Sequence, residues 1–162
     1  MQSDYEKLMN YAFRLLASKR YTSFEISKKL TQFLERHELE DEDLIESALK
    51  RLIELKYIDD AKYAADYVND RVKLKPKGEF LIKRELKLKG IDEDLIDKTI
   101  ESKEIDESEL ASIAFEKKLR QWEKLDTVKI RQKAFGFLSS RGFRPDTIYK
   151  VINTWYGQRS LE

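Results

Sequence analysis

The sequence predicts an all-α protein built from three tandem three-helix repeats. Two observations predict this class: the composition of the chain and an internal repeat. Charged residues make up 39% of the chain and hydrophobic residues 41%, with only 5 Gly and 2 Pro among 162 residues. This composition suits helices that have one apolar stripe and a solvated outer face. It also leaves little material for hairpins or long loops.

The internal repeat is defined by apolar positions that recur along the chain. Two series of positions show the same spacing, with intervals of 51 and then 52 residues. The first series is Ile45, Ile96 and Ile148, and the second is Leu49, Ile100 and Ile152. Periods of this size are typical of stacked arrays, in which each unit buries its apolar face against its neighbours. We therefore expect three repeats, at residues 1–58, 59–105 and 106–159.

The first repeat is expected to hold three helices. Residues 4–18 carry apolar side chains at helical spacing. The second helix begins at Thr22-Ser-Phe-Glu25, where a hydroxyl and a carboxylate can each satisfy an exposed amide in a capping box. The third begins at Glu40-Asp-Glu-Asp43, because carboxylates favour the positive end of the helix dipole. We place Ile53 on its buried face.

The second repeat starts at Asp59-Asp60, which begins a helix with Tyr63 on its inner face. We expect Pro76 in the first turn of the next helix, where its missing N–H donor would be unpaired in any case. We expect that helix to end at Gly90, with the glycine in the left-handed backbone conformation. Asp92-Glu-Asp94 then opens a short sixth helix.

The third repeat starts at Asp106-Glu-Ser-Glu109, which has capping-box spacing. We expect its first helix to include Trp122. The eighth helix stops at Gly142, and Arg144-Pro145 begins the ninth. The first repeat departs from this pattern, since Arg36-His37-Glu38 stands where the other two repeats have a glycine stop.

Several classes of function are excluded by what the sequence lacks. The absence of cysteine excludes a disulfide framework, a thiolate zinc site and a cysteine nucleophile. His37 is the only histidine, and its charged neighbours near a helix end indicate a solvated or helix-terminal role. The acidic runs at 40–43 and 92–94 fit helix capping better than metal binding, because the spacing of a calcium loop is missing. We expect neither an enzyme nor a bound cofactor or metal.

Signals for export and membrane insertion are also missing from the sequence. The first residues lack the charged start and apolar run of a signal peptide. No apolar run approaches the roughly 20 residues that a membrane helix needs. These features, together with the absence of cysteine, favour a cytoplasmic protein.

Charge is strongly segregated along the chain, although the net charge is only +1. The local net charge is +6 at residues 71–89, −7 at residues 92–109 and +5 at residues 117–133. Clustered Lys and Arg can neutralise phosphates and release counterions, so such segments can bind nucleic acid without reading its sequence. The alternative is a solvated face, on which lysine stems cover apolar surface. Charge alone leaves both interpretations open.

The candidate partner- or DNA-binding residues are all basic. They are Arg71, Lys73, Lys75, Lys77, Lys83, Arg84, Lys87, Lys89, Lys117, Lys118, Arg120, Lys124 and Lys129. Aromatic residues could stack on bases, but most of them fall on apolar stripes, where we expect them to pack in the core. Tyr57 and Phe80 are the two whose position could instead be exposed.

Three segments together resemble the RecX family of bacterial recombination regulators. The first runs from Leu55 to Val68, with an Ile-Asp-Asp turn and an aromatic-Ala helix. The second is Arg84-Glu-Leu-Lys-Leu-Lys-Gly-Ile91, and the third is Phe137-Leu-Ser-Ser-Arg-Gly-Phe143. Each segment alone is only moderately specific, but their order and spacing are specific, and the resemblance covers nearly the whole chain.

The resemblance implies a curved, elongated molecule that binds the RecA recombinase. It implies binding chiefly to the RecA filament on single-stranded DNA, along the helical groove. The expected effect is inhibition or tuning of ATPase, strand exchange and co-protease activities, with roles in DNA recombination, DNA repair and the SOS response. Two alternatives stay open: a module that binds single-stranded nucleic acid directly, and a helical scaffold for another protein. We expect a monomer.

Overall fold

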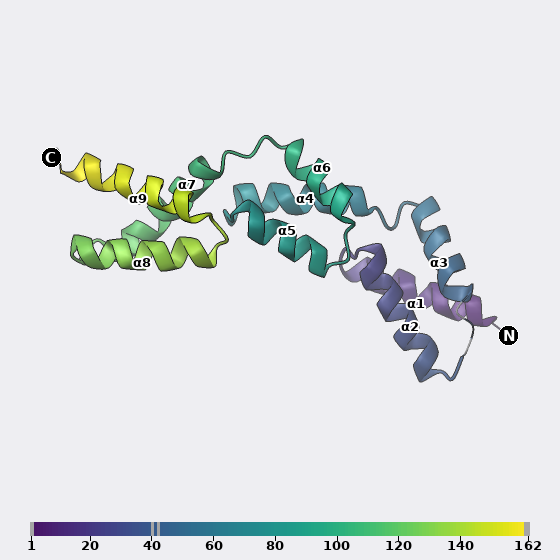
Figure 1. Ribbon diagram of the computed structural model, residues 1–162. Helices are drawn as coiled ribbons and strands as arrows, with labels where there is room; N and C mark the ends of the chain where they lie inside the picture. The colour runs from purple at the N-terminus through teal and green to yellow at the C-terminus, as the bar shows by residue number, and fades with distance from the viewer. Residues whose placement is uncertain (1, 40, 42, 161–162) are drawn as a thin grey trace.

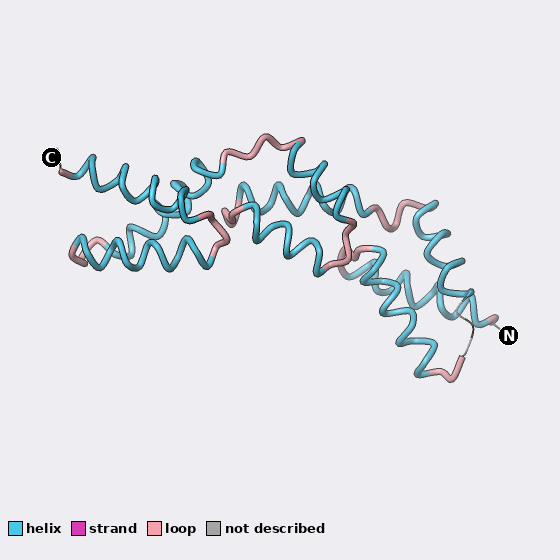
Figure 2. Tube along the Cα trace, viewed as in Figure 1, coloured by secondary structure: helices cyan, strands magenta, loops and turns pink. Residues whose placement is uncertain are grey.

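The computed structural model describes residues 2–39, 41 and 43–160, and these residues fold into nine α-helices and one 3₁₀ turn, with no strand. The helices form three successive groups along an elongated, bent molecule, and the two termini lie at opposite ends (Figure 1). Loops and turns join the helices (Figure 2). The predicted all-α repeat array is confirmed. None of the described helices is long and apolar enough to cross a membrane.

Each group contains three helices. The first group contains α1 (Asp4–Ser18), α2 (Ser23–Arg36) and α3 (Asp43–Glu54). The second contains α4 (Asp60–Lys73), α5 (Glu79–Leu88) and α6 (Glu93–Glu101). The third contains α7 (Glu107–Leu119), the 3₁₀ turn η1 (Arg120–Trp122), α8 (Thr127–Ser140) and α9 (Pro145–Arg159). Within a group, every α-helix packs against the other two.

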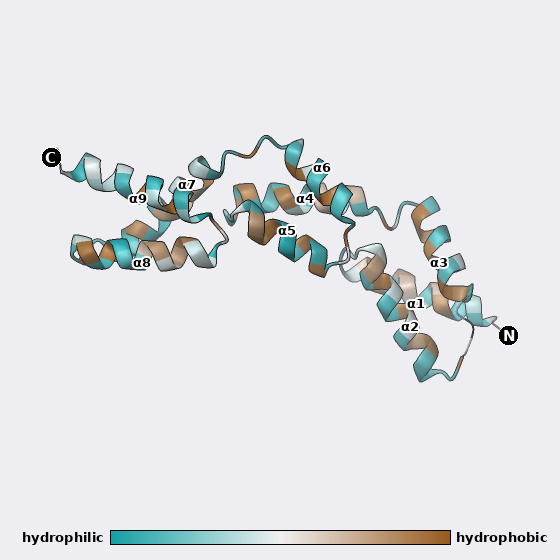
Figure 3. Cartoon of the chain, in the orientation of Figure 1, coloured by the Kyte–Doolittle hydropathy of each residue, from teal (hydrophilic) through white to brown (hydrophobic). Residues whose placement is uncertain are grey.

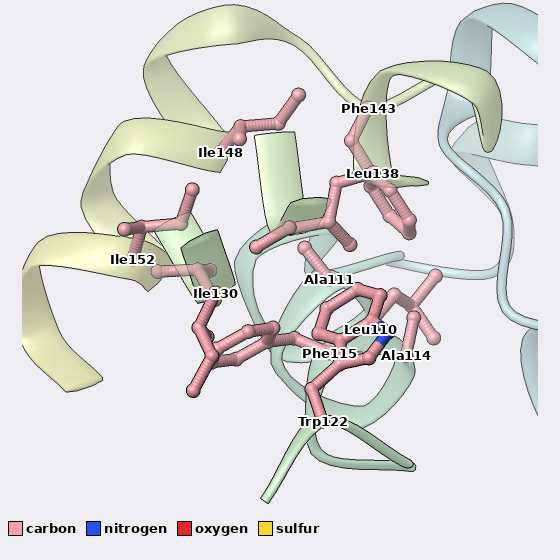
Figure 4. Close-up of a cluster of buried hydrophobic side chains, with 12 residues drawn as sticks. Leu110, Ala111, Ala114, Phe115, Trp122, Ile130, Leu138, Phe143, Ile148 and Ile152 are labelled. Carbon is pink, nitrogen blue, oxygen red and sulfur yellow. The ribbon is translucent and has the colours of Figure 1, made fainter. Parts of the chain in front are cut away.

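Each group buries its own hydrophobic cluster. Fully buried side chains at the three centres are Leu8, Leu30 and Leu52, then Val68, Ile82 and Ile96, then Ile130, Leu138 and Ile148. Each helix carries both apolar and polar residues along its length (Figure 3). In the third group, apolar side chains from α7, α8 and α9 point into one interior (Figure 4). We propose that the folded units divide between residues 58 and 59 and between 105 and 106, because each range holds one cluster.

Polar side chains cap the helix starts at the places that the sequence predicts. Thr22 and Glu25 form both bonds of a capping box at the start of α2. The side chains of Asp59, Asp92 and Asp106 accept backbone N–H bonds at the starts of α4, α6 and α7. The predicted start of the third helix lies partly outside the described residues, and α3 is described from Asp43 onward.

The predicted helix ends are also confirmed. Gly90 and Gly142 have φ angles of 74° and 80°, which is the left-handed region that favours glycine. In the first group, Glu38 takes a φ of 53° in place of a glycine. His37 lies just before it as the C-cap of α2, with Nδ1 2.8 Å from the Phe33 carbonyl.

Three details of the prediction are wrong. Pro76 is not in the first turn of α5, because the chain stays extended at Gly78 and the helix begins only at Glu79. Ile53 is 51% exposed, since its neighbour Leu52 takes the inward position and adjacent helix residues point about 100° apart. Trp122 lies in η1 rather than in α7, although its ring is still buried and meets Phe137 edge-on.

Candidate interaction surface

The two junctions between consecutive groups join the same helix positions, although the donor is a side-chain hydroxyl at the first junction and a backbone N–H at the second. At the first junction, the hydroxyl of Thr22, the N-cap of α2, donates to the Lys89 carbonyl at the end of α5 (2.6 Å). At the second, the N–H of Gly78, the N-cap of α5, donates to the Arg141 carbonyl at the end of α8 (2.8 Å). The C-terminal turn of each middle helix therefore docks on the N-terminus of the middle helix before it.

A carboxylate completes each junction in the same way. The N–H of Ser23, the first residue of α2, donates to Asp60 at 2.8 Å. The N–H of Glu79, the first residue of α5, donates to Glu107 at 3.3 Å. Asp60 and Glu107 are the first residues of α4 and α7. Each carboxylate thus satisfies a helix-terminal amide of the preceding group and opposes the positive end of its dipole.

Basic residues between positions 71 and 89 are largely held in ion pairs with the protein's own carboxylates. Arg71 and Lys77 both pair with Glu85. The remaining pairs of this segment are Lys83 with Glu79 and Asp97, Lys87 with Glu93, and Lys89 with Glu25. These five candidate residues are thus committed to contacts within the fold, which the sequence did not show.

The pairing around Glu85 ties α4 to α5. Tyr67 donates its hydroxyl to Glu85, and Arg71 donates to the Tyr67 oxygen at 3.1 Å while its guanidinium lies over the Tyr67 ring. Burial opposes ionisation of Glu85, but hydrogen bonds from Lys77 and Tyr67 outweigh it and hold the pKa of Glu85 below its ordinary value. Burial and the bond to Glu85 raise the pKa of Tyr67. Arg71 and Lys77 therefore have a structural role here.

A second set of candidate residues forms no ion pair within the described part of the chain. This set is Lys73, Lys75, Arg84, Lys117, Lys118, Arg120 and Lys124. All are exposed except Lys118, which is partly buried. Lys129 instead pairs with Asp126 at 3.5 Å. Cations without an internal partner are the ones available to an external anion.

The second junction brings some of these cations together. Lys75, which precedes α5, and Lys117 and Lys118 of α7 line one cavity of about 220 Å³. Its other lining residues are Leu74, Pro76, Ala114, Gln121, Phe137 and Arg141. Arg120 lies instead beside a different cavity, with Trp155 and Arg159. The remaining unpaired candidates, Lys73, Arg84 and Lys124, line neither cavity.

Comparison with known proteins supports the repeat assignment. Residues 59–100 match the family model described as the second three-helix domain of RecX, and residues 105–152 match the third. The chain is 33% identical over 144 residues to the "Regulatory protein RecX" of Haemophilus influenzae strain Rd, which covers 88% of this chain and 91% of the relative. The chain belongs to the RecX family.

Other RecX proteins agree in sequence and in structure. The regulatory protein RecX of Chlorobium phaeobacteroides strain BS1 is 33% identical, over 93% of this chain and 95% of the relative. The crystal structure of RecX from Lactobacillus salivarius superposes with a TM-score of 0.75 and 26% identity, covering 93% of this chain and 96% of that one. The relatives are named as regulatory proteins, in line with the predicted regulatory class.

Arg141 is the cavity residue that the charge-based selection missed. It lies outside the basic segments but immediately precedes Gly142, as Lys89 precedes Gly90. A basic residue before both glycine stops is therefore a signal that the sequence contained. The burial predictions for these aromatic residues are confirmed. Trp122 is buried in the core, while Tyr57 and Phe80, the two whose position could instead be exposed, are 54% and 66% exposed. Within the described residues, no group of acidic or histidine side chains is arranged to hold a metal ion.

Proposed function

We propose that the protein regulates the RecA recombinase in the cytoplasm by binding along its filament on single-stranded DNA. Membership of a family whose relatives are named regulatory proteins supports a regulatory role. The observation that carries the proposal is the set of unpaired cations on both sides of the second junction of an elongated array. Such a surface suits a long anionic partner better than a small substrate.

The mechanism follows from shape and charge. A bent array of three groups can lie in the helical groove of a filament and contact successive protomers (Figure 1). The unpaired cations would face acidic partner surfaces or bound DNA, and complementary charge speeds encounter and sets orientation. Occupation of the groove would obstruct a second DNA strand and the protomer movements of ATP hydrolysis. We therefore expect inhibition of ATPase, strand exchange and co-protease activities.

The ion-paired cations make a different contribution from the unpaired ones. The charges of Arg71, Lys77 and Lys83 are largely balanced by carboxylate partners, which also hold these side chains in place. Reversing their charge would disrupt α4 and α5 as well as any binding. Lys73 and Arg84 are exposed without an internal partner in the described part of the chain, so they can be reversed with little change to the fold.

The test is recombinase ATPase on single-stranded DNA, titrated with this protein. We expect the rate to fall as the protein is added, and the triple variant Lys73→Glu, Arg84→Glu, Lys124→Glu to need a higher concentration for the same effect. The matched control, Lys29→Glu, Lys50→Glu, Lys98→Glu, reverses three exposed lysines elsewhere and should act like the unmodified protein. An ATPase rate that never responds to the protein would overturn the proposal.

A further inference from the structure

The cavity at the second junction is built by three separate segments of the chain. Leu74, Lys75 and Pro76 come from the connection between α4 and α5. Lys117 and Lys118 come from α7, and Phe137 and Arg141 from the end of α8. We call this cavity, with all nine of its lining residues, the junction cavity. It is shared by the second and third groups of helices.

The junction cavity carries positive charge that the fold leaves unbalanced. Lys75, Lys117, Lys118 and Arg141 line it, and none of the acidic residues that the structure describes does. Within the residues that the structure describes, none of these four side chains forms an ion pair. Cations gathered without counter-charge repel one another, so an anion that enters the cavity is stabilised by all of them.

Two of the four cations are held in place by an aromatic ring. The Lys118 ammonium lies 5.6 Å from the centre of the Phe137 ring, and the Arg141 guanidinium lies 5.2 Å from it. Such cation–π contacts favour side-chain positions beside the ring over positions in open solvent. The Phe137 ring is itself packed edge-on against buried Trp122. The donors at this wall of the cavity are therefore preorganised.

We propose that the junction cavity binds a phosphodiester group of single-stranded nucleic acid. Donors from three segments suit a tetrahedral phosphate, whose oxygens accept from several directions, whereas a planar carboxylate is best met by one guanidinium fork. Apolar side chains lie beside the cations, and Leu74 is 70% exposed. Single strands present the apolar faces of sugars and bases to such side chains.

A ligand in the junction cavity would also fasten two groups of helices to each other. Lys75 belongs to the second group and the other three cations to the third, so one phosphate would contact both sides of the junction. The bond from the Gly78 N–H to the Arg141 carbonyl lies at the same junction. Nucleic acid binding should therefore slow hydrogen exchange at the Gly78 amide.

The experiment measures binding of a fluorescent oligothymidylate to the full chain by polarisation, without recombinase. The double variant Lys75→Gln, Lys117→Gln removes one cavity cation from each side of the junction. Its affinity should fall about tenfold, as expected when a charge-assisted hydrogen bond is removed. The slope of log affinity against log salt should fall by about 0.7 for each phosphate that the variant no longer neutralises. The control, Lys98→Gln, Lys133→Gln, removes two exposed lysines from the same two groups and should bind almost as the unmodified chain does.

Other results would overturn the proposal. Equal losses in the two double variants would indicate diffuse surface charge instead of a site. Displacement of the oligonucleotide by a polyglutamate peptide of equal charge would assign the cavity to acidic peptides. Protection of the Gly78 amide by inorganic phosphate alone, to the same extent as by oligonucleotide, would assign it to small anions. The inference rests on the proposed function, because that function supplies the single-stranded DNA. The two proposals can fail separately: a recombinase ATPase that does not respond to the protein would contradict the proposed function, and it would leave the oligonucleotide-binding result unaffected.

Discussion

The first junction, between α2 and α5, and the second, between α5 and α8, join the same helix positions and differ in their charges. At the first, Lys89 pairs with Glu25 at 3.3 Å. At the second, the position of Lys89 is taken by Arg141, and Leu81 stands three residues after the N-cap, where α2 has Glu25. Replacing a carboxylate by leucine leaves the cation without its partner. At the first junction an internal carboxylate therefore neutralises the cation, whereas at the second junction the cation can bind an external anion.

The largest expected effect tests how closely the second junction must approach. A Cβ added at Gly78 would lie 2.0 Å from the Gly142 carbonyl oxygen and 2.6 Å from the Phe143 amide, so backbone would have to move. We expect Gly78→Ala to lower the free energy of unfolding by about 1–3 kcal/mol, the range for overpacked sites. Thermal unfolding measures this loss, and small-angle scattering should show a changed angle between the groups.

The control for this substitution is a glycine of the third group that lies away from the contact at Gly78. Gly136 lies on an exposed face of α8, and a Cβ there would meet nothing within 4 Å. Gly136→Ala should raise the stability by about 0.5–1 kcal/mol, because alanine loses less backbone entropy in a helix. Equal melting temperatures for the two variants would show that the contact between Gly78 and Gly142 does not constrain the junction.

The same comparison shows what the sequence could and could not predict. Helix starts such as Thr22 and helix stops such as Gly142 were predicted, because caps depend on residues a few positions apart. The junction contacts were not predicted, since the bond from Thr22 to Lys89 joins residues 67 positions apart. The pairing of Lys89 could not be predicted for the same reason, because its partner Glu25 lies in another repeat.

An intermediate effect is expected at the N-cap of the first junction. Thr22 is fully buried, and its hydroxyl both accepts from the Glu25 N–H and donates to the Lys89 carbonyl. Thr22→Val keeps the shape but removes both bonds, and we expect a loss of about 1–2 kcal/mol, as for other lost caps. Thr22→Ser keeps the hydroxyl and should retain most of the stability in a denaturant titration. A valine variant as stable as the serine variant would contradict a role for these bonds.

The smallest expected effect tests the charge difference itself. Glu25→Gln removes the charge that faces Lys89 but keeps an oxygen for the capping bond from the Thr22 N–H. Because both side chains are partly exposed, the pair should contribute at most about 1 kcal/mol at neutral pH. The variant should also bind oligothymidylate more tightly than the unmodified chain, since Lys89 would then lack an ion pair, as Arg141 does among the described residues.

The pH dependence of this ion pair provides an independent check. Burial disfavours the charged form of Lys89, but Tyr63 and Glu25 outweigh it and raise the pKa of Lys89 above its ordinary value. A cation with a raised folded-state pKa contributes stability below its unfolded pKa of about 10.4, and loses it as the pH rises through the folded value. The stability difference between the unmodified chain and Glu25→Gln should therefore be constant near neutral pH and shrink in strongly alkaline buffer. A difference in melting temperature that persists there would mean that Glu25 stabilises the first junction through its shape or its cap, and not through its charge.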